Sequence, residues 1–425
     1  MKRIANYPIE RSEIAGVPVQ RLATEFGGTP VFVYDAAKIV ERYNDVKDFG
    51  VVRFAQKACP NLAIVKLLRG LGAKVDAVSA GELQRALAAG YAPSEIAYTA
   101  DIFDEDALEL VVGAAWGCVV NVGSPDMIYQ LGARLGERAR GLGLTLRVNP
   151  GFGHGHSRKT NTGGELSKHG VWYGQIHDCV DMATHFGMDV TGLHMHIGSG
   201  SDFEHLQSVC DAMESVCLAV GSRIRTISCG GGLPVPYETG GEYIDVSEFT
   251  ARWHGVVKRL EESFGHAVTL EIEPGRYLVA ESGSLITQIR SIKKQHETLF
   301  YLVDAGFTHL VRPMAYGSYH PISLARNPSN TTVADGEVDA VVGGPLCESG
   351  DVFTQEEGGF VVTRRLPKAN VGDYLVLEVA GAYGAAMSSN YNSKFLAPEV
   401  LIESGVPRLI RRKQSFEHMI ANEIF

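Results

Sequence analysis

The stretch AKVDAVSAGELQRALAAGYAPSEIAYTA, residues 73–100, contains the pattern that decides the fold. Two short strand-like runs, 73–79 and 95–100, flank the helical pattern GELQRALAAG at 81–90. Alternation of strand and helix is typical of a parallel sheet, because each strand must return to the same end of the sheet through a crossover. The stretch therefore predicts one strand–helix–strand unit.

The same alternation extends in both directions from this stretch. Helical patterns such as SPDMIYQLGARLG at 124–136 separate most of the strand-like runs. Eight runs are present: VVRFAQ (51–56), AKVDAVS (73–79), EIAYTA (95–100), CVVNVG (118–123), LTLRVNP (144–150), VTGLHMHIG (190–198), RTISCGGG (225–232) and TLEIEPG (269–275). They predict an α/β fold built on a closed (β/α)8 TIM-like barrel. An open, doubly wound sheet is the alternative.

A different pattern begins after about residue 285, where helical patterns become rare and short strand-like runs follow one another. These runs are LITQIRSI (285–292), TLFYLVDAG (298–306), VDAVVGG (338–344), GFVVTRR (359–365) and DYLVLEV (373–379). They predict a second, mostly antiparallel β-barrel or sandwich domain at the C-terminus. On pattern alone, TPVFVYD at 29–35 could pair with either part.

The composition is that of an ordinary globular protein, with 45% hydrophobic and 21% charged residues and a net charge of −10. Lysine and arginine form no dense run, so no nucleic-acid partner is predicted. No stretch is long and apolar enough to span a bilayer, and no apolar core follows the basic residues at the N-terminus. We therefore expect a cytoplasmic protein without a membrane partner.

Seven cysteines are scattered along the chain and include no CxxC pair. An odd number without such a pair disfavours a disulfide framework and a structural zinc site. Most of these thiols are expected to be buried and inert in a reduced protein. Cys347 is the exception, because of the motif around it.

Polar residues and glycines follow most of the predicted barrel strands. They are Lys57, Ser79, Asn149, His196, the run Gly230–Gly232, and Glu273. In a barrel of this kind the active site is built at the carboxyl ends of the strands. These residues are therefore expected to line one mouth, with Lys57 at the rim of a pocket and not in a core.

Three of these features suggest a ligand when taken together. A lysine at a barrel mouth can form an imine, and glycines with Ser199 beyond the sixth run can cradle a phosphate. A carboxylate such as Glu273 can hold a ring nitrogen, and Arg276 a phosphate or carboxylate. Taken singly, each feature has a simpler explanation: an ion-paired lysine, a tight turn, or a salt bridge between Glu273 and Arg276.

His194 and His196 flank Met195 and are expected on one face of a strand. Such a pair could bind zinc, but no matching Asp or His cluster follows the other strands. An imidazole ring can instead lie flat against an aromatic cofactor. Together with the imine, phosphate and ring-nitrogen contacts, this predicts pyridoxal 5′-phosphate as the cofactor and no metal.

The sequence resembles the diaminopimelate decarboxylase family, within the barrel-fold (fold-type III) pyridoxal-phosphate enzymes that include alanine racemase and the ornithine and arginine decarboxylases. The resemblance covers nearly the whole chain and includes FAQKACPN, GFGHGHSRKTNTGGELSKHG, HMHIGSG, CGGGLPVPY, EIEPGR, GPLCESGDVF and GAYGAAMSSNYN. It implies a carboxy-lyase that converts meso-2,6-diaminopimelate to L-lysine and CO2, the last step of lysine biosynthesis. It also implies a homodimer with shared active sites. The domains expected are an N-terminal segment (1–35) that packs with the β-domain, the barrel (36–285) and the β-domain (286–425).

The resemblance further implies a role for each motif residue. Lys57 would hold the cofactor as an internal aldimine, and Cys347 would be the proton donor, delivered from the second subunit. The implied cofactor contacts are Lys57, His196, Ser199, Gly231, Gly232, Glu273, Pro274, Gly275, Arg276 and Tyr383. The implied substrate contacts are Arg276, Arg312, Tyr316, Glu348 and Tyr383.

The chemistry of these side chains agrees with decarboxylation. Glu273 would keep the pyridine nitrogen protonated and the ring a strong electron sink, whereas alanine racemase has an arginine there. Cys347 can protonate the resulting carbanion, because a thiol carries its proton at neutral pH. Arg312 could hold the distal carboxylate of the substrate and Glu348 its distal ammonium. Ornithine and arginine lack that carboxylate and would leave Arg312 unpaired, although an ordinary salt bridge is the alternative for this residue.

Other functions remain open on the sequence alone. They are a decarboxylase of ornithine, arginine or a carboxylated polyamine, a non-catalytic pyridoxal-phosphate-binding homologue, and a metal-dependent barrel hydrolase that uses His194 and His196. The glycine-rich segment 151–170 could form a mobile lid over the mouth, and the sequence does not decide whether it does. His154 and His156, within it, are given no role.

Overall fold

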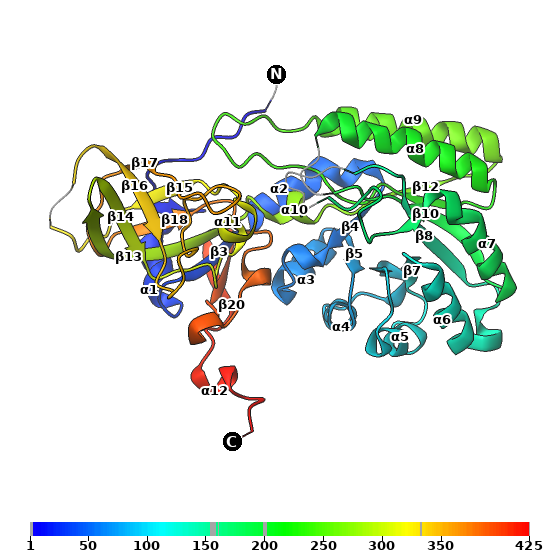
Figure 1. Cartoon of the computed structure of the whole chain (residues 1–425), viewed down its shortest axis with the longest axis horizontal. Helices are drawn as coiled ribbons and strands as arrows, with labels where there is room; N and C mark the ends of the chain where they lie inside the picture. The colour runs from blue at the N-terminus through cyan, green and yellow to red at the C-terminus, as the bar shows by residue number, and fades with distance from the viewer. Residues whose placement is uncertain (1–2, 154–158, 160, 199–201, 332–333, 425) are drawn as a thin grey trace. The chain divides into compact units, whose positions relative to one another are not determined.

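The computed structural model describes residues 3–153, 159, 161–198, 202–331 and 334–424 (Figure 1). The chain divides into two compact units. The barrel unit comprises Arg42–Pro234 and Ile244–Tyr277; the β unit comprises Met1–Glu41, Val235–Tyr243 and Leu278–Phe425. These bounds differ from the expected divisions at residues 36 and 286. Helices α2 (Ala36–Val46) and α10 (Gly275–Val279) each carry the chain from one unit into the other, and segment 235–243 joins the β unit.

Eight parallel strands form a closed barrel, which confirms the predicted fold class. They are β4 (Val51–Ala55), β5 (Lys74–Ala77), β6 (Ile96–Ala100), β7 (Val119–Val122), β8 (Gly143–Asn149), β10 (Asp189–His194), β11 (Thr226–Ser228) and β12 (Thr269–Ile272). The first strand, β4, pairs with the last, β12, and β8 pairs with β10, so the ring is complete. A short strand, β9 (Val171–Trp172), adds to the end of β8.

The barrel helices begin at side chains that cap them. They are α3 (Leu62–Gly70), α4 (Ala80–Ala88), α5 (Glu105–Val112), α6 (Pro125–Leu135), α7 (Ile176–His185), α8 (Phe203–Val220) and α9 (Val246–Phe264). Six of them have an Asn, Ser or Asp cap that accepts a hydrogen bond from a backbone N–H of the first turn. The cap of α4 is Ser79, so helix capping accounts for the polar residue after β5.

The barrel interior contains a buried ion pair. Arg53 on β4 donates from Nε and Nη2 to the two carboxylate oxygens of Glu271 on β12, at 2.7 and 2.8 Å. A third donor, Nη1, reaches the carbonyl oxygen of Glu95. The pair ties the first barrel strand to the last one.

The β unit is mostly antiparallel, also as predicted. Its strands are β1 (Glu13–Ile14), β2 (Val17–Pro18), β3 (Val31–Asp35), β13 (Gly283–Gln295), β14 (Thr298–Val303), β15 (Ile322–Ala325), β16 (Glu337–Gly343), β17 (Arg364–Pro367), β18 (Tyr374–Leu377), β19 (Glu399–Glu403) and β20 (Val406–Arg411). Its helices are α1 (Val19–Glu25), α11 (Arg312–Tyr316) and α12 (Phe416–Met419). The predicted run 359–365 is a strand only from Arg364 onward. Val361, earlier in the run, forms an isolated bridge.

The N-terminal segment belongs to the core of the β unit. Strand β3 lies between β13 and β19, antiparallel to the first and parallel to the second. Val31 and Val33 of β3 are buried in one cluster with Ile286 and Val400. The pattern TPVFVYD therefore pairs with the β unit and not with the barrel.

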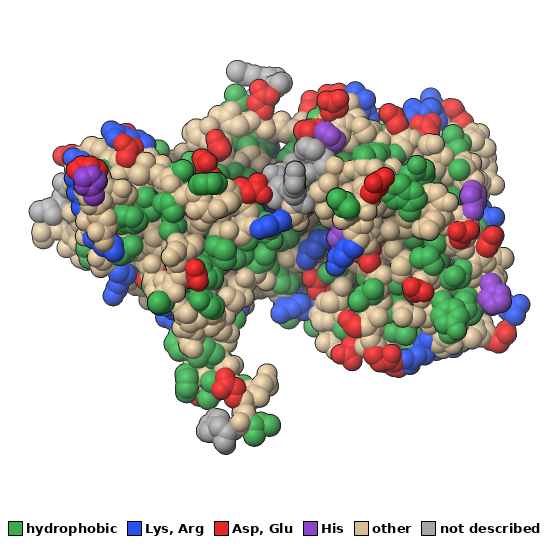
Figure 2. Space-filling view, viewed as in Figure 1, with side chains coloured by type: hydrophobic (Ala, Val, Ile, Leu, Met, Phe, Trp, Pro, Cys, Tyr) green, Lys and Arg blue, Asp and Glu red, His purple; other side chains and the backbone are tan. Residues whose placement is uncertain are grey.

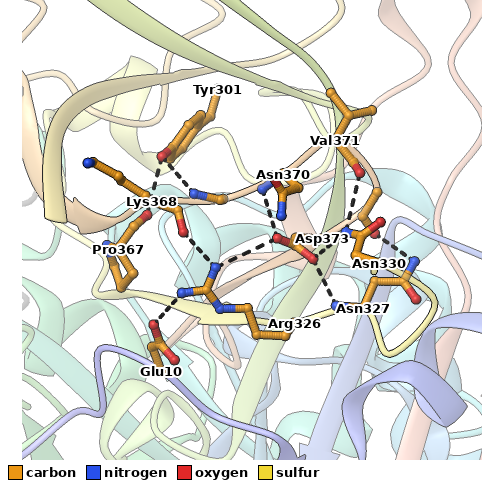
Figure 3. A network of polar contacts seen from close by, with 12 residues as sticks. Glu10, Tyr301, Arg326, Asn327, Asn330, Pro367, Lys368, Asn370, Val371 and Asp373 are labelled. Atoms are coloured by element: carbon orange, nitrogen blue, oxygen red, sulfur yellow. Dashed lines mark hydrogen bonds and ion pairs between the residues drawn. The ribbon is translucent and has the colours of Figure 1, made fainter. Parts of the chain in front are cut away.

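A polar network fixes two loops at one edge of the β unit (Figure 3). Asp373, which is buried, accepts hydrogen bonds from the backbone N–H groups of Asn327 and Asn370 and from the amide of Asn330. Arg326 donates to Glu10 and to the carbonyl oxygen of Lys368. The N-terminal segment is thereby attached to the loops before β16 and after β17.

The surface agrees with the composition. Acidic and basic side chains are interspersed on the face shown in Figure 2 and form no continuous basic stripe. Within the described parts of the chain, no helix is long and apolar enough to cross a membrane. Of the seven cysteines, all free, only Cys347 is exposed.

Candidate active site

Lys57 lies directly after β4, in the single-turn helix η2 (Gln56–Ala58). Its side chain is exposed, whereas Gln56 and Ala58 on either side are buried. The amide of Gln56 donates to the carbonyl oxygen of Glu82 at 3.0 Å, which fixes the turn against the start of α4. The lysine is therefore presented by a rigid turn at the carboxyl end of a barrel strand, as predicted.

Glu273 follows β12 and is buried and ionised. Its Oε2 accepts from Nε2 of His194 and its Oε1 from the hydroxyl of Ser228, both at 2.9 Å. Burial alone would raise the pKa of this carboxyl, but the charge and hydrogen bond of His194, with the Ser228 hydroxyl, lower it to about 2. Each carboxylate oxygen retains a second lone pair, so the group can still accept a proton donor from a ligand.

His194 thus has a carboxylate as its hydrogen-bond partner. Its side chain is buried on the last residue of β10, beside Ser228 in the pairing with β11. Among the residues described, no group of three or more His, Cys, Asp or Glu side chains could hold a metal ion. The two residues that set the charge of Glu273 come from neighbouring strands, so the sequence alone did not reveal them.

His196 lies two residues beyond the end of β10. Its Nδ1 is buried without a hydrogen-bond partner. Burial, together with the positive charges of Arg147 and Lys57, lowers the pKa of the imidazole well below its ordinary value. The ring is therefore neutral, and a neutral imidazole can stack on an aromatic ring without adding charge.

The glycine run after β11 forms a cradle that side chains would fill. Gly230 and Gly232 have φ angles of 63° and 104°, a region that favours glycine. A Cβ on Gly231 would lie 2.6 Å from the carbonyl oxygen of Glu273 and 3.8 Å from Cε1 of His196. The run is therefore packed against both residues. A side chain at Gly231 would occupy the space beside this backbone. Ser199 lies outside the described residues, so its predicted contact stays a prediction.

The segment Glu273–Pro274–Gly275–Arg276 passes close to the lysine turn. A Cβ on Gly275 would lie 3.0–3.1 Å from the carbonyl oxygen and Cβ of Ala55 and 3.3 Å from Cβ of Ala58. Pro274 and Arg276 are buried in the same segment. The close approach places the segment after β12 against the turn after β4 that carries Lys57.

Two further charged residues inside the barrel were missed by sequence reasoning. Asp76 on β5 and Arg147 on β8 are both buried. Burial, and then the charge of Glu273, raise the pKa of Asp76 well above its usual range. Burial also lowers the pKa of Arg147, although the charges of Asp101 and Glu273 act to raise it. The signal was present, because each is a charged residue with apolar neighbours on both sides in a predicted strand.

The described ends of the glycine-rich segment 151–170 are fixed to the barrel. The side chain of Asn149 accepts from the backbone N–H groups of Gly151 and Gly164 and donates to the Gly164 carbonyl. Asp101, after β6, accepts from the N–H of Gly170 at 2.9 Å and lies 2.6 Å from Nδ1 of His169. His154 and His156 lie outside the described residues, and the lid stays a prediction.

The other predicted site residues belong to the β unit. Arg312 begins α11 and is buried, and Tyr316 ends that helix half-buried. Cys347 and Glu348 are exposed in the loop after β16. Tyr383 is half-buried with a φ of 58°, a strained conformation for a tyrosine.

Two contacts define the loop that carries Cys347. The backbone N–H of Cys347 donates to Oδ1 of Asn392 at 2.9 Å. The buried carboxylate of Asp351 accepts from the N–H groups of Leu346 and Phe307, both at 2.7 Å. Asn392 itself has a φ of 52°, so the sequence motif SSNYN places a left-handed residue opposite the cysteine.

Comparisons with known proteins give the family. Residues 36–280 match the model described as "Pyridoxal-dependent decarboxylase, pyridoxal binding domain". The diaminopimelate decarboxylase of Escherichia coli (strain K12) is 52% identical over 408 residues, 95% of this chain and 96% of the relative. A crystal structure of a diaminopimelate decarboxylase, 50% identical, superposes with a TM-score of 0.92 and covers 98% of this chain and 99% of that one. The chain belongs to the diaminopimelate decarboxylase family of pyridoxal-dependent decarboxylases.

A third similar structure is that of Helicobacter pylori diaminopimelate decarboxylase complexed with L-lysine. It is 29% identical, with a TM-score of 0.83, and the match covers 95% of this chain and 99% of that one. Family membership makes this chain a carboxy-lyase and pyridoxal phosphate its cofactor. The barrel residues fit that group: an ionised carboxylate, an unpartnered imidazole nitrogen, a glycine cradle and an exposed lysine surround one mouth.

Proposed function

We propose that this chain removes CO2 from meso-2,6-diaminopimelate and releases L-lysine, the last step of lysine biosynthesis. The observation that carries the proposal is the buried Glu273 carboxylate, which His194 and Ser228 keep ionised. When bound, pyridoxal phosphate supplies an electron sink whose strength depends on protonation of its ring nitrogen. A carboxylate held in its ionised form keeps that nitrogen protonated.

The barrel residues bind and orient the cofactor. Lys57 supplies the amine that links the cofactor to the chain, and the exposed position of its side chain leaves room for exchange with a substrate amine. Gly231, Gly232 and Ser199, with Arg276 and Tyr383, would hold the phosphate. The neutral ring of His196 would lie against the pyridine ring and keep water from it.

The β-unit residues select the substrate. Arg312 pairs with the distal carboxylate of diaminopimelate, and Glu348 with its distal ammonium group. Tyr316 and Tyr383 are the other two substrate contacts proposed in the β unit. Ornithine and arginine lack the second carboxylate and would leave a buried guanidinium without its substrate partner, which costs affinity.

Cys347 acts as the proton donor after loss of CO2. Its side chain is exposed in the single chain, which suits a group delivered to the site of a second subunit. We therefore propose a homodimer with shared active sites, in the cytoplasm. Size-exclusion chromatography with light scattering would test the dimer separately from the chemistry.

A competition assay tests the function directly. The purified protein receives pyridoxal phosphate and equal amounts of meso-diaminopimelate, ornithine and arginine, and the amines formed are identified. We expect lysine alone. Putrescine or agmatine would contradict the assignment of Arg312, and absence of any product would contradict catalysis itself.

A further inference from the structure

We propose that His320 is a positioning residue that holds the guanidinium of Arg312 in the orientation that reads the distal carboxylate of the substrate. The inference rests on the role proposed for Arg312. It concerns a side chain eight residues further along the chain, which no motif of the sequence singled out. Both side chains are 1% exposed.

The contacts of His320 define its tautomer. Nδ1 lies 2.9 Å from the carbonyl oxygen of Glu378, and a carbonyl can only accept, so Nδ1 carries the hydrogen. Nε2 lies 3.0 Å from Nη1 of Arg312, and a guanidinium can only donate. Nε2 therefore presents a lone pair, and the imidazole is neutral.

Two other neutral groups contact the guanidinium of Arg312. Nη2 donates to the hydroxyl of Ser318 at 3.1 Å, and Cζ lies 4.8 Å from the ring centroid of Tyr237. The ring of Tyr237 in turn meets His320 edge to face, at 5.4 Å and 83°. These three contacts are with neutral groups and fix the orientation of the guanidinium, which is the group that can pair with a carboxylate.

The backbone places these groups where they are needed. Gly317 caps the end of helix α11, and its φ of 59° turns the chain back toward Arg312. A Cβ on Gly317 would lie 2.0 Å from the backbone nitrogen of Glu357, so no other residue fits the turn. Ser318 and His320 follow at once, which is why both reach the side chain at the start of the same helix.

His320 is itself held by a stiff part of the β unit. Its carbonyl oxygen accepts from Nη1 of Arg364, and the next residue, Pro321, accepts from the N–H of Glu378. Strands β15 and β18 pair directly beyond this point. The two carboxylate oxygens of the buried Glu378 side chain accept from Nη1 of Arg11, and one of them also accepts from the hydroxyl of Ser284. The imidazole is thus anchored at its far side and has one nitrogen left for Arg312.

Two substitutions distinguish the roles of the two ring nitrogens of His320. His320→Asn keeps a donor near the position of Nδ1 and removes the acceptor for Arg312. His320→Gln reaches the position of Nε2 with an amide oxygen and is the matched control of similar polarity. We expect His320→Asn to raise the KM for meso-diaminopimelate roughly tenfold, with kcat and the cofactor absorbance nearly unchanged, because a buried charged donor loses its acceptor. The KM of His320→Gln should stay closer to that of the wild type.

A double-mutant cycle with Arg312→Lys completes the test. If His320 acts through Arg312, His320→Asn adds little to the KM of Arg312→Lys. Additive effects, or equal KM values for the Asn and Gln variants, would overturn the positioning role. A wild-type KM in His320→Asn beside a raised KM in Arg312→Lys would overturn it while leaving the proposed function intact. A wild-type KM in Arg312→Lys itself would remove the distal-carboxylate assignment, and the inference with it.

Discussion

Asn392 fixes the backbone of Cys347, since its Oδ1 accepts the Cys347 N–H at 2.9 Å. The two residues are far apart in the sequence, and the cysteine side chain is otherwise exposed. A proton donor must reach one carbon atom, so the orientation of its loop bears directly on the rate of proton transfer.

We expect Asn392→Gly to lower kcat several-fold by releasing this loop. Glycine tolerates the φ of 52°, so the change removes the acceptor without backbone strain. Steady-state kinetics should show the loss, and the cofactor absorbance should not change. Asn390→Ala, whose side chain serves Lys394 and Gln414 instead, is the control. Cys347→Ala sets the lower bound, with a fall of roughly 10²-fold or more; full activity there would refute the proton-donor assignment.

Removal of the Glu273 charge should abolish most of the activity. Glu273→Gln keeps the shape of the side chain but can no longer stabilise a protonated ring nitrogen, so kcat should fall roughly 10²-fold or more. Ser228→Ala removes one hydrogen bond from the carboxylate and keeps its charge, and should cost less than about tenfold. Equal losses in the two variants would show that the charge is not what matters.

The same carboxylate predicts how stability depends on pH. Its folded pKa of about 2 lies below an unfolded value of roughly 4.3. A depressed pKa stabilises the fold above the unfolded value, and the contribution is lost as the pH falls from roughly 4.3 toward 2. The difference in unfolding midpoint between the wild type and Glu273→Gln should therefore change little above pH 5 or so and move against the wild type at lower pH. A constant difference from pH 6 to pH 3 would contradict the assignment.

The glycine cradle predicts a defect in cofactor binding. Gly231→Ala would place a Cβ 2.6 Å from the carbonyl oxygen of Glu273, so the loop must shift. We expect roughly tenfold weaker binding of pyridoxal phosphate, followed by its visible absorbance, because overpacked sites cost about 1–3 kcal/mol. Gly70→Ala, at the end of α3 with open space around it, should bind the cofactor normally. Unchanged affinity in Gly231→Ala would exclude the run as a phosphate cradle.

The pair Arg53–Glu271 predicts a large cost in stability when only one of its partners is removed. Arg53→Leu leaves a buried carboxylate and should cost about 3–5 kcal/mol in urea titrations. The double variant Arg53→Leu, Glu271→Leu should recover much of that loss, because no unpaired charge remains. Arg259→Leu, which breaks an exposed pair with Glu214 between α8 and α9, should cost no more than about 1 kcal/mol. A similar cost for both single variants would contradict the burial argument.

The sequence predicted the parts of the structure that depend on local pattern. All eight barrel strands were found, because each is a short apolar run bounded by polar residues, and Lys57 and Glu273 were recognised by their places just after two of those runs. His320 and Asn392 were not found, since their importance lies in contacts with residues on other elements. Asp76 and Arg147 were overlooked because each interrupts a run that was treated as apolar.

Two expectations failed for a similar reason. His194 and His196 were expected on one face of a strand, but β10 ends at His194, and His196 lies beyond it. The run 359–365 has the composition of a strand, yet only its last two residues join one. Composition does not show which backbone groups find a neighbouring strand.

The seam between β4 and β12 sets an order of events during synthesis. Val51 pairs with Glu271 and Val52 with Ile272, so the lysine turn and the buried carboxylate meet only where the ring closes. A nascent chain cannot complete this site until the ribosome has passed residue 273. Binding of the cofactor at this site therefore requires the closed ring, and the appearance of its visible absorbance during refolding would follow the pairing of β4 with β12.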